Sequence, residues 1–307
     1  AMAEFNLPAR RSLLQEALSR FVETRNIEEQ IRTHLWLGLV NASIAEQKAR
    51  HPDVERQDPL NNLEQSLNLA KQHGFSCEAA ESQSWMGSIL LAQNKLSDAK
   101  VHINAAMSAF HRLKPESNLR AKQGLALTSV LLGEVFMKQH QPRMARAYLM
   151  QAMRIFSENN DIKKLADTTG KLSELVLNEG NTEEALSLLT HQLQLTQRID
   201  QPIPIRTAHI ALGNFHLMQA NFAEAREHYS QALTIAQDTK DRHTESFIMA
   251  SLANVVLDEG KPNVAIPEYE KALALAVHER IQPGMELEEL QRKACFDAAG
   301  EPRRWKI

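Results

Sequence analysis

The segments that decide the fold are Leu212–Leu233, LGNFHLMQANFAEAREHYSQAL, and Leu252–Leu273, LANVVLDEGKPNVAIPEYEKAL. Both begin with leucine, a small residue and asparagine, and both later carry alanine, tyrosine and the pair Ala-Leu at the same offsets. The two segments start 40 residues apart. A sparse pattern that returns at a fixed interval is typical of a repeat protein.

The same register extends through much of the chain. A small residue that follows a large apolar one serves as the reference position, and it recurs every 40 residues at Gly133, Ser173, Gly213 and Ala253. Offsets of 12 and 16 from each reference residue hold an alanine and then leucine or tyrosine. Four repeats in one register are too regular to arise by chance.

Each unit of the pattern predicts two antiparallel helices. The first helix carries the reference residue, a turn follows seven residues later, and the second helix carries mostly alanine at offsets 12 and 19. Small residues let the two backbones approach closely, while the large residue at offset 16 fills the remaining volume. One such hairpin cannot bury its own apolar stripe, so the units must stack. The sequence therefore predicts an all-α solenoid of antiparallel helix pairs.

We expect residues 1–307 to form a single solenoid with two interruptions. HPDVERQDP at 51–59 is predicted to be a loop or an extended helix tip, which delays the second helix of the repeat around Gly38 by about nine residues. HRLKPESNLRAKQ at 111–123 is predicted to lengthen a later connection. The predicted elements are an orphan helix at 9–23, repeats at about 31–74, 80–113, 126–158, 166–198, 206–238 and 246–278, and a capping helix at about 284–298.

The composition argues against several classes of partner. The chain carries 35 Lys and Arg against 38 Asp and Glu, a net charge of −3, so it lacks the basic field that nucleic acid or an anionic membrane would need. No run of 18 or more apolar residues predicts a membrane span. The cysteines, Cys77 and Cys295, are too far apart in the sequence to suggest a zinc site or a disulfide framework. We therefore expect a reducing compartment, the cytoplasm, or the nucleus in a eukaryote.

The sequence also argues against catalysis. HExxH, GxGxxG, GxxxxGK[ST] and GxSxG do not occur. His209 and His216 lie seven residues apart on one predicted helix, too far to share a metal, so we interpret them as partly buried neutral packing residues. Cys295 is interpreted as a small packing residue rather than a nucleophile. We expect neither an enzyme nor a bound cofactor or metal.

These marks resemble the tetratricopeptide repeat family over nearly the whole chain. The small residues of each repeat, the turn residue Gly260 and the aromatic residues Tyr229 and Tyr269 match the family pattern. The chain departs from it in lacking the common tryptophan near the start of each first helix, where it has residues such as His209, and in its period of 40 residues instead of 34. Longer repeats of this kind resemble spindle-orientation adaptors, kinesin light chain and the sensor domains of maltose-type activators.

The resemblance implies a right-handed superhelical solenoid whose first helices line a concave face that holds a peptide or helix. The chaperone-adaptor clamp of that family, a lysine one turn before the ligand-facing asparagine, is absent, since Ile210 and Ala250 occupy those places. The candidate partner-binding residues are Trp36, Trp85, Glu134, Met137, Glu174, Asn214, Phe247 and Asn254.

Each kind of candidate residue has a structural alternative. The two tryptophans could instead fill space between helices, the asparagines could form hydrogen bonds between repeats, and the glutamates could be merely solvated. The two glutamates, Glu134 and Glu174, occupy equivalent repeat positions and favour a basic or amine-bearing ligand.

Three functions remain open on the sequence. The first is a protein–protein interaction scaffold that binds an extended or helical segment with apolar anchors. The second is a ligand- or peptide-sensing regulatory module of a larger protein, and the third is the non-catalytic targeting domain of an enzyme. The sequence leaves the oligomeric state open.

Overall fold

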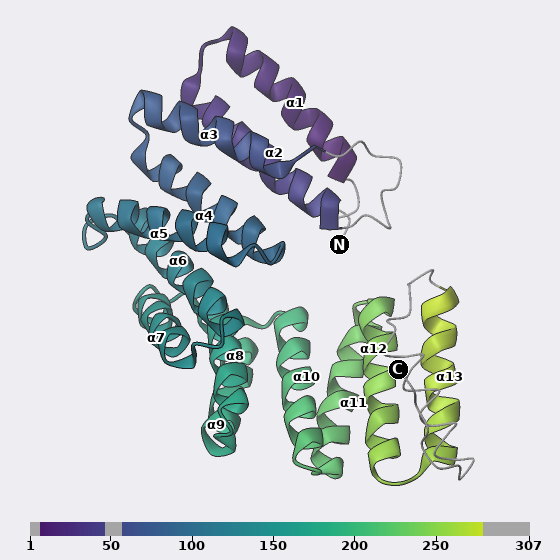
Figure 1. Ribbon diagram of the computed structural model, residues 1–307. Helices are drawn as coiled ribbons and strands as arrows, with labels where there is room; N and C mark the ends of the chain where they lie inside the picture. Colours follow the sequence, from purple (N-terminus) through teal and green to yellow (C-terminus); the bar gives the residue numbers. More distant parts are fainter. Residues whose placement is uncertain (1–6, 47–56, 279–307) are drawn as a thin grey trace, which may run out of the picture. The chain divides into compact units, whose positions relative to one another are not determined.

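The computed structural model describes residues 7–46 and 57–278, and these residues are helical throughout, apart from the connections, with no strand among them (Figure 1). The chain divides into two compact units, Ala1–Asn160 and Asp161–Ile307. In unit 1 the helices are α1 (Leu7–Glu23), α2 (Ile27–Glu46), α3 (Pro59–His73), α4 (Ser76–Ala92), α5 (Leu96–Arg112), α6 (Leu119–Lys138) and α7 (Pro142–Glu158). In unit 2 they are α8 (Ile162–Asn178), α9 (Thr182–Ile199), α10 (Pro202–Met218), α11 (Phe222–Asp238), α12 (Arg242–Asp258) and α13 (Pro262–His278).

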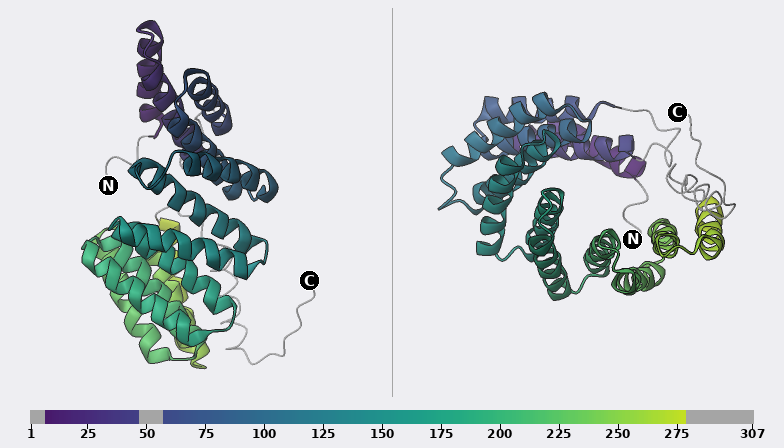
Figure 2. Two further views of the ribbon diagram at one scale, coloured as in Figure 1. Left: turned by 90° about the vertical axis from the view of Figure 1, so that its left-hand side faces the viewer. Right: turned by 60° about the horizontal axis from the view of Figure 1, so that its bottom comes forward.

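Within each unit, successive helices pack as antiparallel pairs. The pairs are α2–α3, α4–α5 and α6–α7 in unit 1, and α8–α9, α10–α11 and α12–α13 in unit 2. The first helices of neighbouring pairs also touch, α2 with α4 and α4 with α6 in unit 1, and α8 with α10 in unit 2. Figure 2 shows the same side-by-side stacking within each unit from two further directions. The predicted all-α solenoid of helix pairs is confirmed, while its extent as one domain stays a prediction.

Close approach at the reference glycines fixes the two helices of a pair. A Cβ atom on Gly213 would lie 2.7 Å from the ring of Tyr229, and one on Gly133 would lie 2.8 Å from Leu149. These partners are the large residues at offset 16, as the pattern predicts. At Gly38 the partner is Leu63, nine residues later than offset 16 would place it, because the second helix α3 is delayed by the insertion.

In five of the pairs, α4–α5 to α12–α13, the turn inside the pair contains a residue in the left-handed region. The φ angles are 59° at Asn94, 55° at His140, 82° at Gly180, 56° at Ala220 and 81° at Gly260. All five lie seven residues after a reference residue, where the sequence predicts the turn. Glycine and asparagine adopt this conformation at low cost, whereas alanine does not.

One predicted connection is wrong in part. The sequence pattern places residues 111–123 in a lengthened connection, but residues 111–112 end α5 and residues 119–123 begin α6. Asn118 caps this helix, since its side-chain oxygen accepts a hydrogen bond from the backbone N–H of Ala121. The cap and the helix-forming residues that follow start α6 earlier than the repeat pattern alone indicates.

Some predictions lie outside the described residues. These are the capping helix at 284–298, Cys295, and residues 51–56 of the insertion. The end of the insertion is described, and there Asp58 caps α3 while Pro59 occupies its first turn. No helix in the described part of the chain is long and apolar enough to cross a membrane.

Candidate functional site

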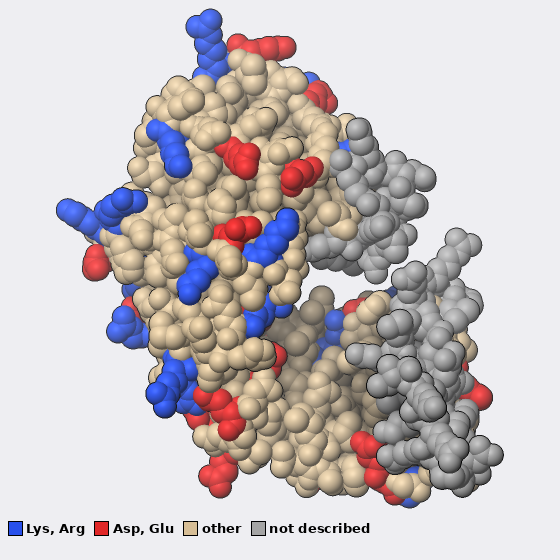
Figure 3. Space-filling view, viewed as in Figure 1, with Lys and Arg blue, Asp and Glu red and all other residues tan. Residues whose placement is uncertain are grey.

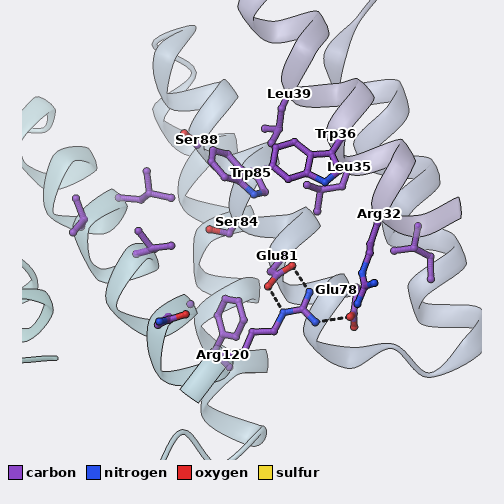
Figure 4. Close-up of a pocket in the computed structure, with 17 residues that line it drawn as sticks. Arg32, Leu35, Trp36, Leu39, Glu78, Glu81, Ser84, Trp85, Ser88 and Arg120 are labelled. Carbon is purple, nitrogen blue, oxygen red and sulfur yellow. Dashed lines mark hydrogen bonds and ion pairs between the residues drawn. The ribbon is translucent and has the colours of Figure 1, made fainter. Parts of the chain in front are cut away.

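The first helices of unit 1, α2, α4 and α6, line an open groove of about 640 Å³ (Figure 4). Most of its lining is apolar, and all lining residues except Phe110 of α5 come from these first helices. The lining residues are Ile31, Arg32, Leu35, Trp36, Leu39, Glu78, Glu81, Ser84, Trp85, Ser88, Phe110, Arg120, Gln123, Gly124, Leu127, Val130 and Leu131.

Two of the predicted contact residues, Trp36 on α2 and Trp85 on α4, lie in this groove. In Figure 4 their indole rings are near one another on adjacent helices. Trp36 is 49% exposed and Trp85 is 40% exposed, so neither ring is buried between helices. Arg10 of α1 lies over the Trp36 ring, with its guanidinium carbon 5.9 Å from the ring centroid.

An ion cluster lies at one end of the groove, where Arg120 of α6 meets two carboxylates of α4 (Figure 4). Nη1 of Arg120 donates to Glu78 at 2.6 Å, while Nε and Nη2 donate to the two oxygens of Glu81 at 2.6 Å and 2.7 Å. The hydrogen bonds to Glu81, and then to Glu78, raise the pKa of the Arg120 guanidinium. Glu78 is buried, and a buried carboxylate needs such a partner.

Cys77, next to this cluster on α4, is not an activated thiol. Burial raises the pKa of Cys77 to about 11, against the opposing effect of Arg120. A thiol with such a pKa stays protonated at neutral pH and is a poor nucleophile.

The sequence interpretation missed the ion cluster. It assigns Arg120 to a connection. Glu78 precedes the predicted start of its repeat at residue 80, and Glu81 lies just inside that start. Arg120 is 39 to 42 positions away from the two glutamates, so no local spacing pattern links them. Only a signal from the repeat register could have placed α4 and α6 as neighbours.

Two other predicted contact residues of unit 1 lie outside the groove lining. Glu134 and Met137, both on α6, are partly exposed but are not among the residues that line the groove. Their assignment as contacts stays a prediction.

In unit 2 the predicted contacts lie on the three first helices, Glu174 on α8, Asn214 on α10, and Phe247 and Asn254 on α12. Glu174 and Asn214 are exposed, and Phe247 is 48% exposed, which is high for an aromatic residue. Their partner-binding role stays a prediction.

Each predicted asparagine bonds the tyrosine of its own repeat. The hydroxyl of Tyr229 donates to the side-chain oxygen of Asn214 at 2.6 Å, and the hydroxyl of Tyr269 donates to that of Asn254. The sequence offered ligand contact or hydrogen bonds between repeats, but these bonds lie within a repeat. The side-chain NH₂ groups remain as donors, because only the oxygens accept from tyrosine.

Among the described residues, no group of three or more His, Cys, Asp or Glu side chains is arranged to hold a metal ion. The structure nevertheless brings His228 of α11 between His209 and His216 of α10. The sequence interpretation treated the two α10 histidines alone and did not include His228.

The fold defines a class of helical-repeat protein in which antiparallel helix pairs stack side by side. Residues 204–276 match a family model described as tetratricopeptide repeat. The chain thus contains tetratricopeptide repeats, and the resemblance drawn from its sequence is confirmed.

Known relatives and structures agree with this class. Tetratricopeptide repeat protein 29 of Macaca fascicularis is 24% identical over 219 residues, which cover 67% of this chain and 45% of that relative. The chain therefore spans less than half the length of this curated relative.

Two solved structures share the fold at low sequence identity. The crystal structure of BtubC (BKLC) from P. vanneervenii has a TM-score of 0.63 at 16% identity, covering 81% of this chain and 95% of that chain. A Rap protein complexed with Competence and Sporulation Factor has a TM-score of 0.59 at 14% identity, covering 88% of this chain and 77% of that chain. Tetratricopeptide repeats of this kind support a protein-interaction scaffold in general.

Proposed function

We propose that this chain is a protein–protein interaction scaffold whose unit 1 groove binds an extended or helical segment of another protein through apolar anchors. The observation that carries the proposal is the pair of half-exposed tryptophans, Trp36 and Trp85, in one groove of about 640 Å³. Exposed tryptophans in a concave, mostly apolar surface are typical of binding sites.

The groove offers enough apolar surface for specific binding. A buried tryptophan contributes about 150–250 Å² of surface, so covering the exposed halves of two rings would remove roughly 200 Å² from water. At about 25 cal/mol per Å², this is worth about 5 kcal/mol before the cost of association. The leucines and valine of the lining add to this, and a short segment can bind with useful affinity.

The charges of the groove favour an uncharged apolar anchor. Arg120 is already paired with Glu78 and Glu81, and Arg32 is paired with Glu28 and Glu29 at 2.6 Å and 3.0 Å. A charged anchor would have to break one of these pairs before it gained a partner.

The remaining uncharged polar groups suit a polypeptide backbone. Ser84 and Ser88 lie one turn apart on α4, and Gln123 lies on α6, all in the lining. Hydroxyl and amide groups both donate and accept hydrogen bonds, as backbone N–H and C=O groups require.

We assign a second contact surface to the first helices of unit 2. Phe247 supplies an exposed aromatic ring, the NH₂ groups of Asn214 and Asn254 supply donors, and Glu174 supplies a carboxylate. Glu134 and Met137 would extend the contacts of unit 1 along α6.

The proposal excludes catalysis, a cofactor, and direct binding of nucleic acid or membrane. The net charge of −3 supports the last two points. On the face seen in Figure 3, basic and acidic side chains are interspersed, and neither sign forms a continuous field. An intracellular, reducing location fits the sparse cysteines.

A second candidate is a sensing regulatory module of a larger protein. The observation that favours it is the fold shared with a Rap protein that was solved in complex with Competence and Sporulation Factor. A sensing module would change the distance between unit 1 and unit 2 on binding, whereas a passive scaffold would not. Spin labels on α3 and α12, with distances measured with and without a bound peptide, separate the two candidates.

Selection of random peptides displayed on phage against the whole chain tests the groove. Selected peptides, synthesised with a fluorophore, are titrated by fluorescence polarisation against wild type, Trp85→Ala and Met150→Ala. Met150 is a matched control because it is 55% exposed on α7, outside the groove.

We expect Trp85→Ala to weaken binding at least about tenfold, as loss of an interface anchor does, and Met150→Ala to leave it unchanged. Equal peptide affinity of the wild type and Trp85→Ala would rule out the groove of unit 1 as the binding site.

A further inference from the structure

Three histidines from two helices gather inside the α10–α11 pair of unit 2. Nδ1 of His209 lies 3.1 Å from Nδ1 of His228, within hydrogen-bonding distance. The ring of His216 stacks on that of His228, with centroids 5.5 Å apart and an interplanar angle of 15°. The rings of Phe215 and His216 are nearly perpendicular, at 85°, with centroids 5.4 Å apart. The three imidazoles thus form one contiguous cluster.

The hydrogen bond between two Nδ1 atoms limits how many protons the pair can hold. When both rings are neutral, one Nδ1–H donates to the lone pair of the other Nδ1. One added proton is compatible with this bond, because a cationic His228 can still donate to a neutral His209. When both rings are cationic, two N–H groups face each other across 3.1 Å and the bond is lost.

The surroundings disfavour charge on the rings of His209 and His228. His209 is buried, and burial, followed by the charge of His228, lowers the pKa of His209, with Glu227 acting in the opposite direction. Burial, followed by the charge of His216, also lowers the pKa of His228, again against Glu227. Nδ1 of His216 is buried without a hydrogen-bond partner among the described residues.

Within the described residues, α8, α9 and α12 pack against α10 or α11 but contribute none of the charges that shift these two pKa values. One turn before His209, Arg206 is a cation already paired with Asp241 at 2.9 Å. Glu227 lies on α11 itself and is exposed to solvent.

We propose that the cluster of His209, His216 and His228 is a proton-sensitive joint that holds α10 against α11 at neutral pH and loosens this pair on mild acidification. The second proton breaks the Nδ1–Nδ1 bond and places like charges on the adjacent rings of His209 and His228. The joint shares no residue with the groove in unit 1, so its test does not depend on peptide binding there.

Another repeat of the chain has a pair of side chains in the same two positions that protonation should not separate. In the α4–α5 pair, Gln83 and His102 occupy the places of His209 and His228, since both pairs are 19 residues apart in the same repeat register. Nδ1 of His102 lies 2.8 Å from the side-chain oxygen of Gln83. An amide oxygen only accepts, so Nδ1–H of His102 donates to it in both charge states. Such a pair survives protonation.

Loosening of α10 against α11 would reach a predicted contact residue. Asn214 lies between His209 and His216 on α10, and it is bonded to Tyr229, which follows His228 on α11. The three histidines therefore flank the hydrogen bond between Tyr229 and Asn214, which orients the Asn214 side chain.

Hydrogen–deuterium exchange on the whole chain tests the proposal, with protection factors corrected for the intrinsic exchange rate at each pH. Between about pH 7.5 and about pH 5.5, protection of 202–238 should fall by about tenfold. Residues 242–278 serve as the internal control, because Met249 and Glu268 replace the histidine pair there. His209→Gln and His228→Gln should each remove the pH dependence while keeping protection at neutral pH.

His191→Gln is the matched control variant, since His191 is an exposed histidine on the neighbouring helix α9. It should retain the wild-type response. Equal protection of 202–238 at both pH values in the wild type would overturn the proposal, and so would an unchanged pH response in both cluster variants. A fall of the same size in 242–278 would also overturn it, because the effect would then be global.

Discussion

Ala220 occupies the left-handed turn between α10 and α11, a position that two other repeats fill with glycine. Its φ angle is 56°, against 82° at Gly180 and 81° at Gly260. The conformation closes two backbone hydrogen bonds, from the N–H of Ala220 to Leu217 at 2.9 Å and from the N–H of Asn221 to His216 at 2.8 Å. The turn thus requires this backbone geometry whichever residue stands there, and Ala220→Gly should stabilise the fold.

The magnitude follows from two opposing costs. An L-residue with a Cβ atom pays about 1–2 kcal/mol in the left-handed region. Glycine avoids this cost but loses about 0.5–1 kcal/mol through its larger backbone entropy in the unfolded chain. The net expectation for Ala220→Gly is a gain of about 0.5–1 kcal/mol in the free energy of unfolding.

Gly260→Ala is the reciprocal variant, and its effect should come from the backbone alone. A Cβ atom at Gly260 would meet no heavy atom within 4 Å. We therefore expect a loss of about 1 kcal/mol without any steric contribution.

Urea unfolding followed by circular dichroism at 222 nm measures both variants. With an m value of about 3 kcal/mol per M, the midpoint should rise by roughly 0.2–0.3 M for Ala220→Gly and fall by a similar amount for Gly260→Ala, with m unchanged. The reasoning is refuted if Ala220→Gly lowers the midpoint, or if Gly260→Ala leaves it where it was.

Three further predictions concern packing, charge and pH. Gly213→Ala should cost about 1–3 kcal/mol of unfolding free energy in urea titrations, because its Cβ would lie 2.7 Å from the buried Tyr229 ring; an unshifted midpoint would contradict the close approach. Arg120→Met should lower the free energy of unfolding by about 2 kcal/mol, less than the loss of a fully buried ion pair, because the Arg120 side chain is 41% exposed. Combining it with Glu78→Gln should recover part of this loss, and additive effects in the double-mutant cycle would argue against the ion pair. Burial lowers the pKa of His34, so its contribution to stability is fully present above about pH 6.5 and is lost as the pH falls below that value. His34→Gln should therefore reduce the drop in urea midpoint between about pH 7.5 and about pH 5.5, and an identical drop in both proteins would count against this assignment.

The register of the repeats was predictable because it depends on contacts between residues close in the sequence. A glycine and the large residue 16 positions later meet across one hairpin, so the spacing alone is enough to pair Gly213 with Tyr229. The same rule, with nine inserted residues added, predicts the contact between Gly38 and Leu63. Helix type, the turns and the first-helix faces follow from the same local spacing.

The groove was predictable only in part. The tryptophans Trp36 and Trp85 could be assigned to a concave face, but their exposure depends on how far apart α2 and α4 stand. Helix starts are set by caps that the repeat pattern does not contain, as Asn118 shows for α6. Because the predicted start of α6 was a few residues too late, Arg120 was assigned to a connection and left out of the candidate site.

The sequence by itself determined the all-α repeat architecture, the pairing of helices and the small-to-large contacts within each pair, because local periodicity controls which faces are apolar. Only the tertiary structure decided the ion cluster of Arg120, Glu78 and Glu81, the tyrosine bond that holds Asn214, and the meeting of His209 with His228. These polar contacts depend on side-chain rotamers and on the spacing between helices, which no short-range pattern in the chain encodes.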